Sequence, residues 1–146
     1  IAISGVTMHK KAFCILDASP LYEAFHVEGG DISVPFMDGS FAVPRRRKTV
    51  EVALPFVVDG KYDVADATNA NVRSGLAANL FWLKSNILGR SLAADGTRLV
   101  ELFLPGADPE DVVSGYAHVT GWQFDLKTKR VWQGVLDLSF PSGTFG

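Results

Sequence analysis

The chain has 146 residues, 47% of them hydrophobic, which is typical of one domain with a single core. Its formal net charge of −2 excludes the cationic excess by which many proteins bind nucleic acid. The only cysteine, Cys14, excludes an intrachain disulfide and a zinc site made of several cysteines.

Residues 1–44 contain short apolar pieces separated by residues that favour turns. The pieces 13–16 and 32–34 are broken by Ser19-Pro20, Gly29-Gly30 and Asp38-Gly39. We therefore expect short strands and long loops in this segment.

The segment 47–58 has the pattern of a strand with one apolar face. Its apolar residues fall at every second position: Val50, Val52, Leu54 and Phe56. Pro55 lacks a backbone donor, which predicts an edge strand or an irregular strand end. Asp59-Gly60 predicts the turn that closes the strand.

A helix is predicted from about Asn69 to Leu88. Apolar residues recur there at spacings of three and four, which places them on one helical stripe: Val72, Leu76, Leu80, Leu83 and Ile87. Thr68 or Asn69 is expected to cap its start, and Gly89 to end it. The stripe should pack on a sheet.

Three further strands are predicted after the helix, over 98–104, 116–125 and 130–140, and residues 126–129 join the last two into a hairpin. In the last strand one face is formed by Trp132, Gly134, Leu136, Leu138 and Phe140. In its partner, Trp122 and Phe124 share their alternate positions with Tyr116, His118 and Thr120, which predicts a strand covered on both faces.

This element order predicts a mainly β fold, an antiparallel β-sandwich or open barrel with one flanking α-helix at about 69–88. Residues 1–146 are expected to form a single domain, with an irregular segment at 1–44 and the sandwich, helix and C-terminal hairpin at 45–146. No internal repeat or linker divides it.

The usual catalytic and ligand-binding motifs are missing from the sequence. His9, His26 and His118 are far apart and lack a metal-binding spacing, and no nucleophile elbow or phosphate-binding loop occurs. The acidic residues Asp108, Glu110 and Asp111 lie among turn residues and lack the spacing of a calcium loop. We expect no enzyme, no cofactor and no metal.

No apolar run reaches the roughly 20 residues that cross a bilayer, and residues 1–12 lack the layout of a secretory signal. We therefore expect a soluble protein without a membrane partner. The densest charge run is Arg45, Arg46, Arg47 and Lys48, at the start of a strand. Because successive strand residues point to opposite faces, this run favours salt bridges to a neighbouring subunit or a solvated strand edge over contact with DNA.

Two stretches resemble proteins of long-tailed (siphovirus-type) phages. Residues 39–60 (GSFAVPRRRKTVEVALPFVVDG) and 73–80 (RSGLAANL) resemble a segment of minor tail proteins from phages of actinobacteria. Residues 121–125 (GWQFD) and 134–143 (GVLDLSFPSG) resemble the end of the N-terminal ring domain of distal tail proteins. The resemblance covers about residues 40–146 and extends to the tail-tube family.

This resemblance implies a structural virion protein of the phage tail, assembled in the host cytoplasm. It implies a homo-oligomeric ring, a hexamer, around a channel through which DNA passes without sequence-specific binding. Other tail proteins (tube, tape measure, baseplate or connector) would be its partners. A tail terminator or head–tail connector ring is the alternative within this class.

The subunit contacts of such a ring are expected at residues 37–48 and at the hairpin 127–130. The predicted interface residues are charged: Arg45, Arg46, Arg47, Lys48, Asp108, Glu110, Asp111, Lys127, Lys129 and Arg130. An alternative of another class is a small β-sandwich module that binds carbohydrate through Trp82, Trp122 and Trp132. Their apolar positions favour core packing instead.

Overall fold

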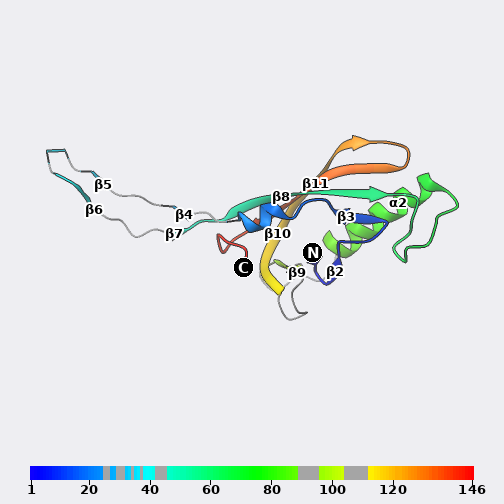
Figure 1. Cartoon of the computed structure of the whole chain (residues 1–146), viewed down its shortest axis with the longest axis horizontal. Coiled ribbons are helices and arrows are strands. Elements are labelled where there is room, and N and C mark those ends of the chain that lie inside the picture. The colour runs from blue at the N-terminus through cyan, green and yellow to red at the C-terminus, as the bar shows by residue number, and fades with distance from the viewer. Residues whose placement is uncertain are drawn as a thin grey trace.

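The computed structural model describes residues 1–24, 27–28, 32–33, 35–36, 38–41, 46–88, 96–103 and 112–146. Its main feature is a seven-stranded sheet in which all neighbouring strands are antiparallel, in the order β2-β1-β9-β10-β11-β8-β3 (Figure 1). The strands are β1 (Ala2–Ile3), β2 (Val6–Thr7), β3 (Phe13–Ile15), β8 (Val50–Asp59), β9 (Arg98–Phe103), β10 (Val112–Lys127) and β11 (Val131–Phe140).

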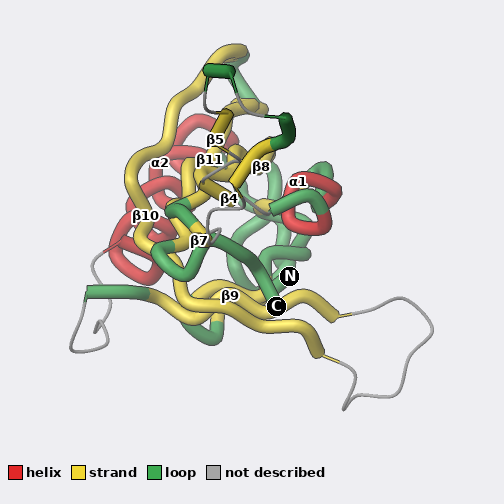
Figure 2. Tube along the Cα trace, turned by 90° about the vertical axis from the view of Figure 1, so that its left-hand side faces the viewer, coloured by secondary structure: helices red, strands yellow, loops and turns green. Residues whose placement is uncertain are grey.

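The described helical segments are a short α1 (Ser19–Tyr22), α2 (Val72–Leu83) and the π-helical turn η1 (Lys84–Leu88) that continues α2. The sheet curls into half a barrel with α2 on its flank, and β10 bends through it (Figure 2). The expected antiparallel β fold with one flanking helix is therefore confirmed, in the form of an open barrel.

β10 joins the two halves of the curled sheet. Residues 112–117 pair with β9, and residues 118–127 pair with β11. Between Val119 and Gly121 the register with β11 shifts by one residue, so Thr120 has no partner and forms a β-bulge. A bulge bends a strand and increases its twist, which gives the curl at this point.

Because of this bulge, the prediction that Trp122 and Phe124 share a face of β10 with Tyr116 is wrong. Ala117 is buried and Tyr116 is 56% exposed, so odd-numbered residues face inward before the bulge. After it Trp122 and Phe124 pack against the core, so even-numbered residues face inward. Trp122 and Phe124 thus do not share a face with Tyr116, because the extra residue reverses the alternation.

The core lies on the concave side of the sheet and follows the predicted alternation in β8 and β11. The buried members from these strands are Val52, Leu54, Phe56, Val58, Leu136, Leu138 and Phe140. The stripe of α2 and η1 packs on them, but unevenly: Leu76, Leu83 and Ile87 are buried, whereas Val72 and Leu80 are only half-buried.

Asn71 caps α2, and its side-chain oxygen accepts hydrogen bonds from the backbone N–H groups of Arg73 and Ser74 at 3.1 and 3.2 Å. The predicted caps Thr68 and Asn69 are therefore wrong. The Asn69 side chain donates instead to the Gly60 carbonyl at 3.0 Å. The helical run ends at Leu88 as predicted, and Gly89 lies outside the described residues.

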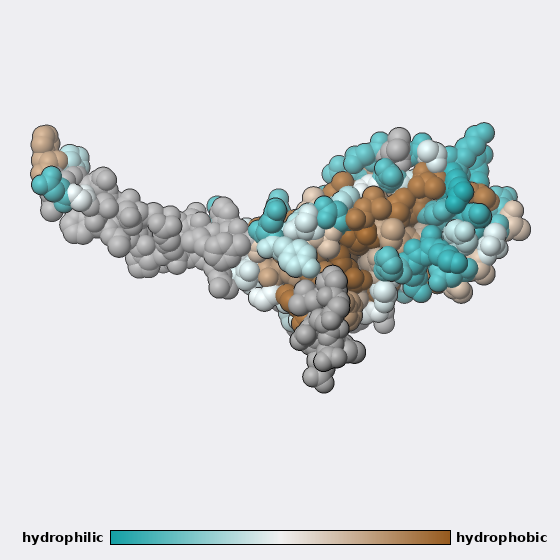
Figure 3. Space-filling model, in the orientation of Figure 1, coloured by the Kyte–Doolittle hydropathy of each residue, from teal (hydrophilic) through white to brown (hydrophobic). Residues whose placement is uncertain are grey.

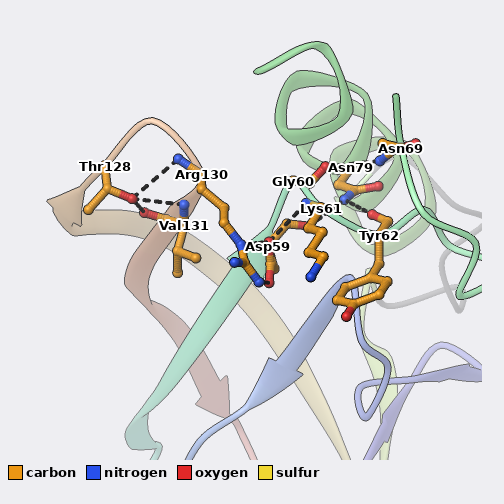
Figure 4. Close-up of polar contacts among 9 residues, drawn as sticks. All are labelled: Asp59, Gly60, Lys61, Tyr62, Asn69, Asn79, Thr128, Arg130 and Val131. Carbon is orange, nitrogen blue, oxygen red and sulfur yellow. Dashed lines mark hydrogen bonds and ion pairs between the residues drawn. The ribbon is translucent and has the colours of Figure 1, made fainter. Parts of the chain in front are cut away.

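Two glycines bring α2 into contact with the turn after β8. A Cβ on Gly60 would overlap the carbonyl oxygen of Val72, and a Cβ on Gly75 would overlap that of Gly60. Beside them, buried Asn79 donates to the carbonyls of Asp59 and Tyr62 at 2.9 and 2.8 Å (Figure 4). These contacts fix the start of α2 against the end of β8.

Pro55 lies where β8 has a free edge among the described residues. β3 pairs only with Phe56, Val57 and Val58, and the Pro55 carbonyl accepts one more bond from Leu16 N–H at 2.8 Å. Because the carbonyl and amide positions of one strand residue point to the same side, the missing donor faces this edge and no ladder bond to β11 is lost.

The segment before β8 forms short strands, as predicted, but three of them lie in the main sheet: β2 beside β1, β1 beside β9, and β3 beside β8. Four others form an arm: β4 (Val27–Glu28) pairs with β7 (Arg46–Arg47), and β5 (Ile32–Ser33) pairs with β6 (Ser40–Phe41). Arg46 and Arg47 thus belong to the arm, and β8 begins only at Val50. Figure 1 places β5 and β6 at the end of the long axis opposite α2.

Candidate functional site

A second irregularity in β10 changes the side chain that faces α2. Phe124 pairs with Gly134 and Leu126 with Gln133, so Asp125 is an extra residue in the ladder. Lys127 consequently pairs with Trp132 and lies on its face of the hairpin. The Lys127 ammonium sits 5.1 Å from the centre of the Trp132 ring, a cation–π distance.

Stacked aromatic rings form the floor beside this lysine. Phe56 stacks on Trp122 with 6.2 Å between ring centres, and Phe124 meets Trp132 edge to face at 5.2 Å. Trp122 and Phe124 are themselves 5.6 Å apart. Each ring is thus held by others, and pairs of this kind add about 0.5–1.5 kcal/mol beyond the burial of their area.

α2 supplies the opposite wall. Leu76 and Leu80 pack toward the aromatic floor, and Phe81 leaves 69% of its surface exposed. Arg73 and Lys84 stand on the same side of the helix. Each of these wall residues lies three or four positions from another, which is the spacing of one helical face.

Between the hairpin and α2 lies a groove of about 730 Å³. This volume lies within the range of about 300–1,000 Å³ that is usual for ligand pockets. Its lining residues are Arg73, Leu76, Ala77, Leu80, Phe81, Lys84, Trp122, Phe124, Lys127, Thr128, Lys129 and Trp132. Figure 3 shows the face of the molecule that is in front in Figure 1, where apolar side chains over the sheet are bordered by hydrophilic ones.

The groove is apolar in its floor and positive at its rim. Among the described residues, four cations line it, Arg73, Lys84, Lys127 and Lys129, and no carboxylate does. No ion pair joins these cations to a carboxylate of the described part of the chain. The arrangement suits a segment that carries apolar side chains together with negative charge.

The fold is similar to that of a phage tail protein. The crystal structure of SPP1 Dit, described as a paradigm of the hub adsorption apparatus in phages that infect Gram-positive bacteria, matches with a TM-score of 0.54 and 10% sequence identity. The match covers 97% of this chain and 49% of Dit, so the chain spans about half the length of that protein. No protein-family profile matches the sequence, and no curated protein is significantly similar to it.

The end of the hairpin formed by β10 and β11 is tied back to the sheet. Arg130 donates two hydrogen bonds to the carboxylate of Asp59, at 3.0 and 2.9 Å, and its carbonyl accepts from Gly60 N–H at 2.9 Å. Within the turn, the Thr128 hydroxyl accepts from Val131 N–H at 2.9 Å (Figure 4). The hydrogen bonds from Arg130 lower the pKa of Asp59, and Asp59 in turn raises the pKa of Arg130.

This ion pair predicts a pH dependence. A carboxyl group with a lowered pKa in the folded state stabilises the fold above its unfolded pKa, and the contribution is lost as the pH falls through the folded pKa. Asp59→Asn should therefore lower the melting temperature slightly at pH 7, and the difference from the wild type should vanish at strongly acidic pH. Asparagine keeps the oxygen that accepts from Lys61 N–H.

The matched variant is Arg130→Met, which removes the cation. It should reproduce the small loss at pH 7, and the double variant should lose no more than either single one. Because Arg130 is half exposed, the effect is small. Equal differences from the wild type at pH 7 and pH 2 would contradict the ion pair.

The predicted interface residues fall into three groups. Arg45, Asp108, Glu110 and Asp111 lie outside the described residues, and only the backbone of Arg46 and Arg47 is described. Lys48, Lys127 and Lys129 are exposed. Arg130 is engaged by Asp59. Lys127 and Lys129 come together at the groove, and a role in subunit contacts remains a prediction for the set.

The three tryptophans occupy two different settings. Trp82 stacks on buried Phe13 with 5.5 Å between ring centres, which fits the expected core packing. Trp122 and Trp132 also pack against the core, and they line the groove as well. Flat exposed platforms for a sugar are therefore not formed by these three rings.

A second apolar surface lies near the N-terminus, beside β1, α1 and β9. It includes Leu16, Tyr22 and Phe103, which are 53%, 62% and 50% exposed, around a hollow of about 290 Å³. His9 is the only basic side chain in its lining. This surface therefore lacks the positive rim of the groove.

Other chemistry is sparse in the part of the chain that the structure describes. No three His, Cys, Asp or Glu side chains gather there as metal ligands would. Burial raises the pKa of the Cys14 thiol, which disfavours the reactive thiolate. No helix among the described ranges is long and apolar enough to span a membrane.

The groove itself was not predicted from the sequence. Its wall and its floor lie about 40 residues apart in the chain, and each taken alone looks like core or like charged surface. The contact of Lys127 with Trp132 could not be predicted, because a strand with regular alternation would place Leu126, not Lys127, on the face of Trp132. The bulge at Asp125 shifts this alternation by one residue.

Proposed function

We propose that this chain is a structural protein of a phage tail. The observation that carries the proposal is the likeness of its fold to SPP1 Dit over 97% of the chain. The resemblance of residues 39–60 and 121–143 to minor and distal tail proteins points the same way, and it rests on sequence rather than on fold.

In its finer form, the proposal is a ring of identical subunits, a hexamer, around the channel of the tail. Curled antiparallel sheets with exposed strand edges can continue from one subunit to the next. The ring would act without catalysis, as a passage for DNA and a seat for other tail proteins. A terminator or connector ring is the alternative position in the tail.

Two features of the structure support self-association. The arm formed by β4–β7 extends away from the sheet (Figure 1), and a projecting arm of this kind commonly reaches a neighbouring subunit. The groove between α2 and the hairpin exposes an aromatic surface with a positive rim. An apolar groove with a polar rim is typical of an interaction site.

Electron microscopy and sedimentation velocity of the purified chain test the proposal. Rings or stacked tubes of uniform diameter are expected at micromolar concentration. A protein that stays monomeric up to about 100 µM and binds immobilised glycans would instead favour the carbohydrate-binding module. A protein that stays monomeric and binds no glycan would also contradict a self-assembling subunit.

A further inference from the structure

The exposed end of the arm is the turn between β5 and β6. Phe36 lies in this turn with its side chain fully exposed (107%) and a backbone φ of 67°, a region that bulky residues rarely adopt. Residues 34–39 (VPFMDG) carry one carboxylate, Asp38, and no cation. We call Phe36 and Asp38 the arm tip.

An aromatic ring that stays exposed at the end of an arm does not stabilise the fold of its own chain through burial. Phe36 makes no contact that would bury it, so the favourable free energy of burying its ring is not gained within its own chain. Aromatic side chains held in this way are common anchors of protein interfaces. The arm tip therefore needs an apolar surface on another molecule.

The groove has an apolar floor and a positive rim, which complement the ring and the carboxylate of the arm tip. Its floor is built from Trp122, Phe124 and Trp132, against which a phenylalanine ring can stack. The described residues of its rim include four cations and no carboxylate, which complements Asp38. The second apolar surface, around Tyr22, has no such rim.

The arm tip cannot fill the groove of its own chain. Figure 1 places β5 and β6 at one end of the long axis and α2 at the other. A contact between two different surfaces of two copies is heterologous, and such contacts produce closed rings or open helices.

We propose that the arm tip of one copy docks in the groove of the next, with the Phe36 ring on the aromatic floor and the Asp38 carboxylate at the rim formed by Lys127 and Lys129. This inference rests on the proposed self-assembly. It joins the two regions predicted to contact neighbours, residues 37–48 and the hairpin 127–130, into one interface.

Two variants test the contact from its two sides. The tip variant Phe36→Ser and the groove variant Lys127→Glu/Lys129→Glu should each weaken self-association at least about tenfold in sedimentation velocity. Their thermal melts should stay near that of the wild type, because all three side chains are exposed. Tyr22→Ser, which removes an exposed aromatic ring from the second surface, is the control and should assemble normally.

Mixing the two variants gives the decisive result. The groove variant keeps an intact arm tip and the tip variant keeps an intact groove, so the mixture should form one-to-one dimers that grow no further. Asp38→Lys combined with the groove variant in one chain should restore larger assemblies, because the charges are exchanged.

The outcomes separate this inference from the proposed function. If the wild type assembles and both variants assemble as well, the arm–groove contact is wrong and the self-assembling subunit stands. If the mixture of two assembly-deficient variants yields no dimer, the two surfaces do not meet each other, and the inference is again overturned. A wild type that stays monomeric at all concentrations contradicts both.

Discussion

Replacing Leu83 with alanine should lower the free energy of unfolding by roughly 2–5 kcal/mol, the usual cost of deleting a buried leucine side chain. Leu83 is 1% exposed and belongs to the core cluster under α2, next to the π-helical turn. A cavity there cannot be filled easily, because the neighbouring backbone is fixed by the Gly60–Gly75 contact and by Asn79. Urea unfolding followed by circular dichroism measures the loss.

Leu80→Ala is the matched control for this variant. The change in helix propensity is the same at both positions, so it cancels in the comparison. Leu80 is only half-buried and lines the groove, and its loss should cost about 1 kcal/mol or less. Equal losses at the two positions would mean that the stripe of α2 is buried evenly, contrary to the structure.

Gly134→Ala should produce the second large effect. A Cβ at this position would overlap the carbonyl oxygen of Gln123 in β10 and lie 3.0 Å from the Phe124 ring. Both neighbours are fixed, the first as strand backbone and the second by Phe56 and Trp132. The hairpin must therefore separate locally, at a cost of about 1–3 kcal/mol or more.

The control is Gly121→Ala in the partner strand. A Cβ there would meet only the Asp137 carboxylate at 3.8 Å, which is an ordinary contact. This variant should leave the urea midpoint near that of the wild type, whereas Gly134→Ala should lower it clearly. Because Gly134 lies beneath the aromatic floor, Trp fluorescence should change only in the Gly134 variant. A Gly134 variant as stable as the Gly121 variant would contradict this account.

The regular parts of the fold could be predicted because their pattern is local. Alternation along β8 and β11 and the four-residue spacing of α2 follow from strand and helix periods alone. The cap could not be assigned in the same way. Thr68, Asn69 and Asn71 are chemically similar caps, and the contact between Asn69 and Gly60 excludes Asn69 through a residue nine positions away.

The candidate site could not be predicted because it depends on two irregularities. The bulges at Thr120 and Asp125 reverse the alternation of β10, and the side chains of these two residues do not predict a bulge. The charged residues of the hairpin were predicted to contact neighbours, and two of them, Lys127 and Lys129, line the groove. The opposite wall of the groove, α2, is predicted from the sequence only to pack on the sheet, because its outer face carries no binding motif.

The place of β1 in the sheet constrains the order of events during synthesis on the ribosome. Ala2 pairs with Glu101, so β1 has to wait for about 100 further residues before its partner in β9 exists. At a synthesis rate of about 5–20 residues per second, this wait lasts roughly 5–20 s. Throughout that time Ile3 and Val6, which end up in the core, lack the strand that β1 pairs with. Distant pairing of this kind slows folding, so nascent chains are most prone to aggregate before β9 has emerged.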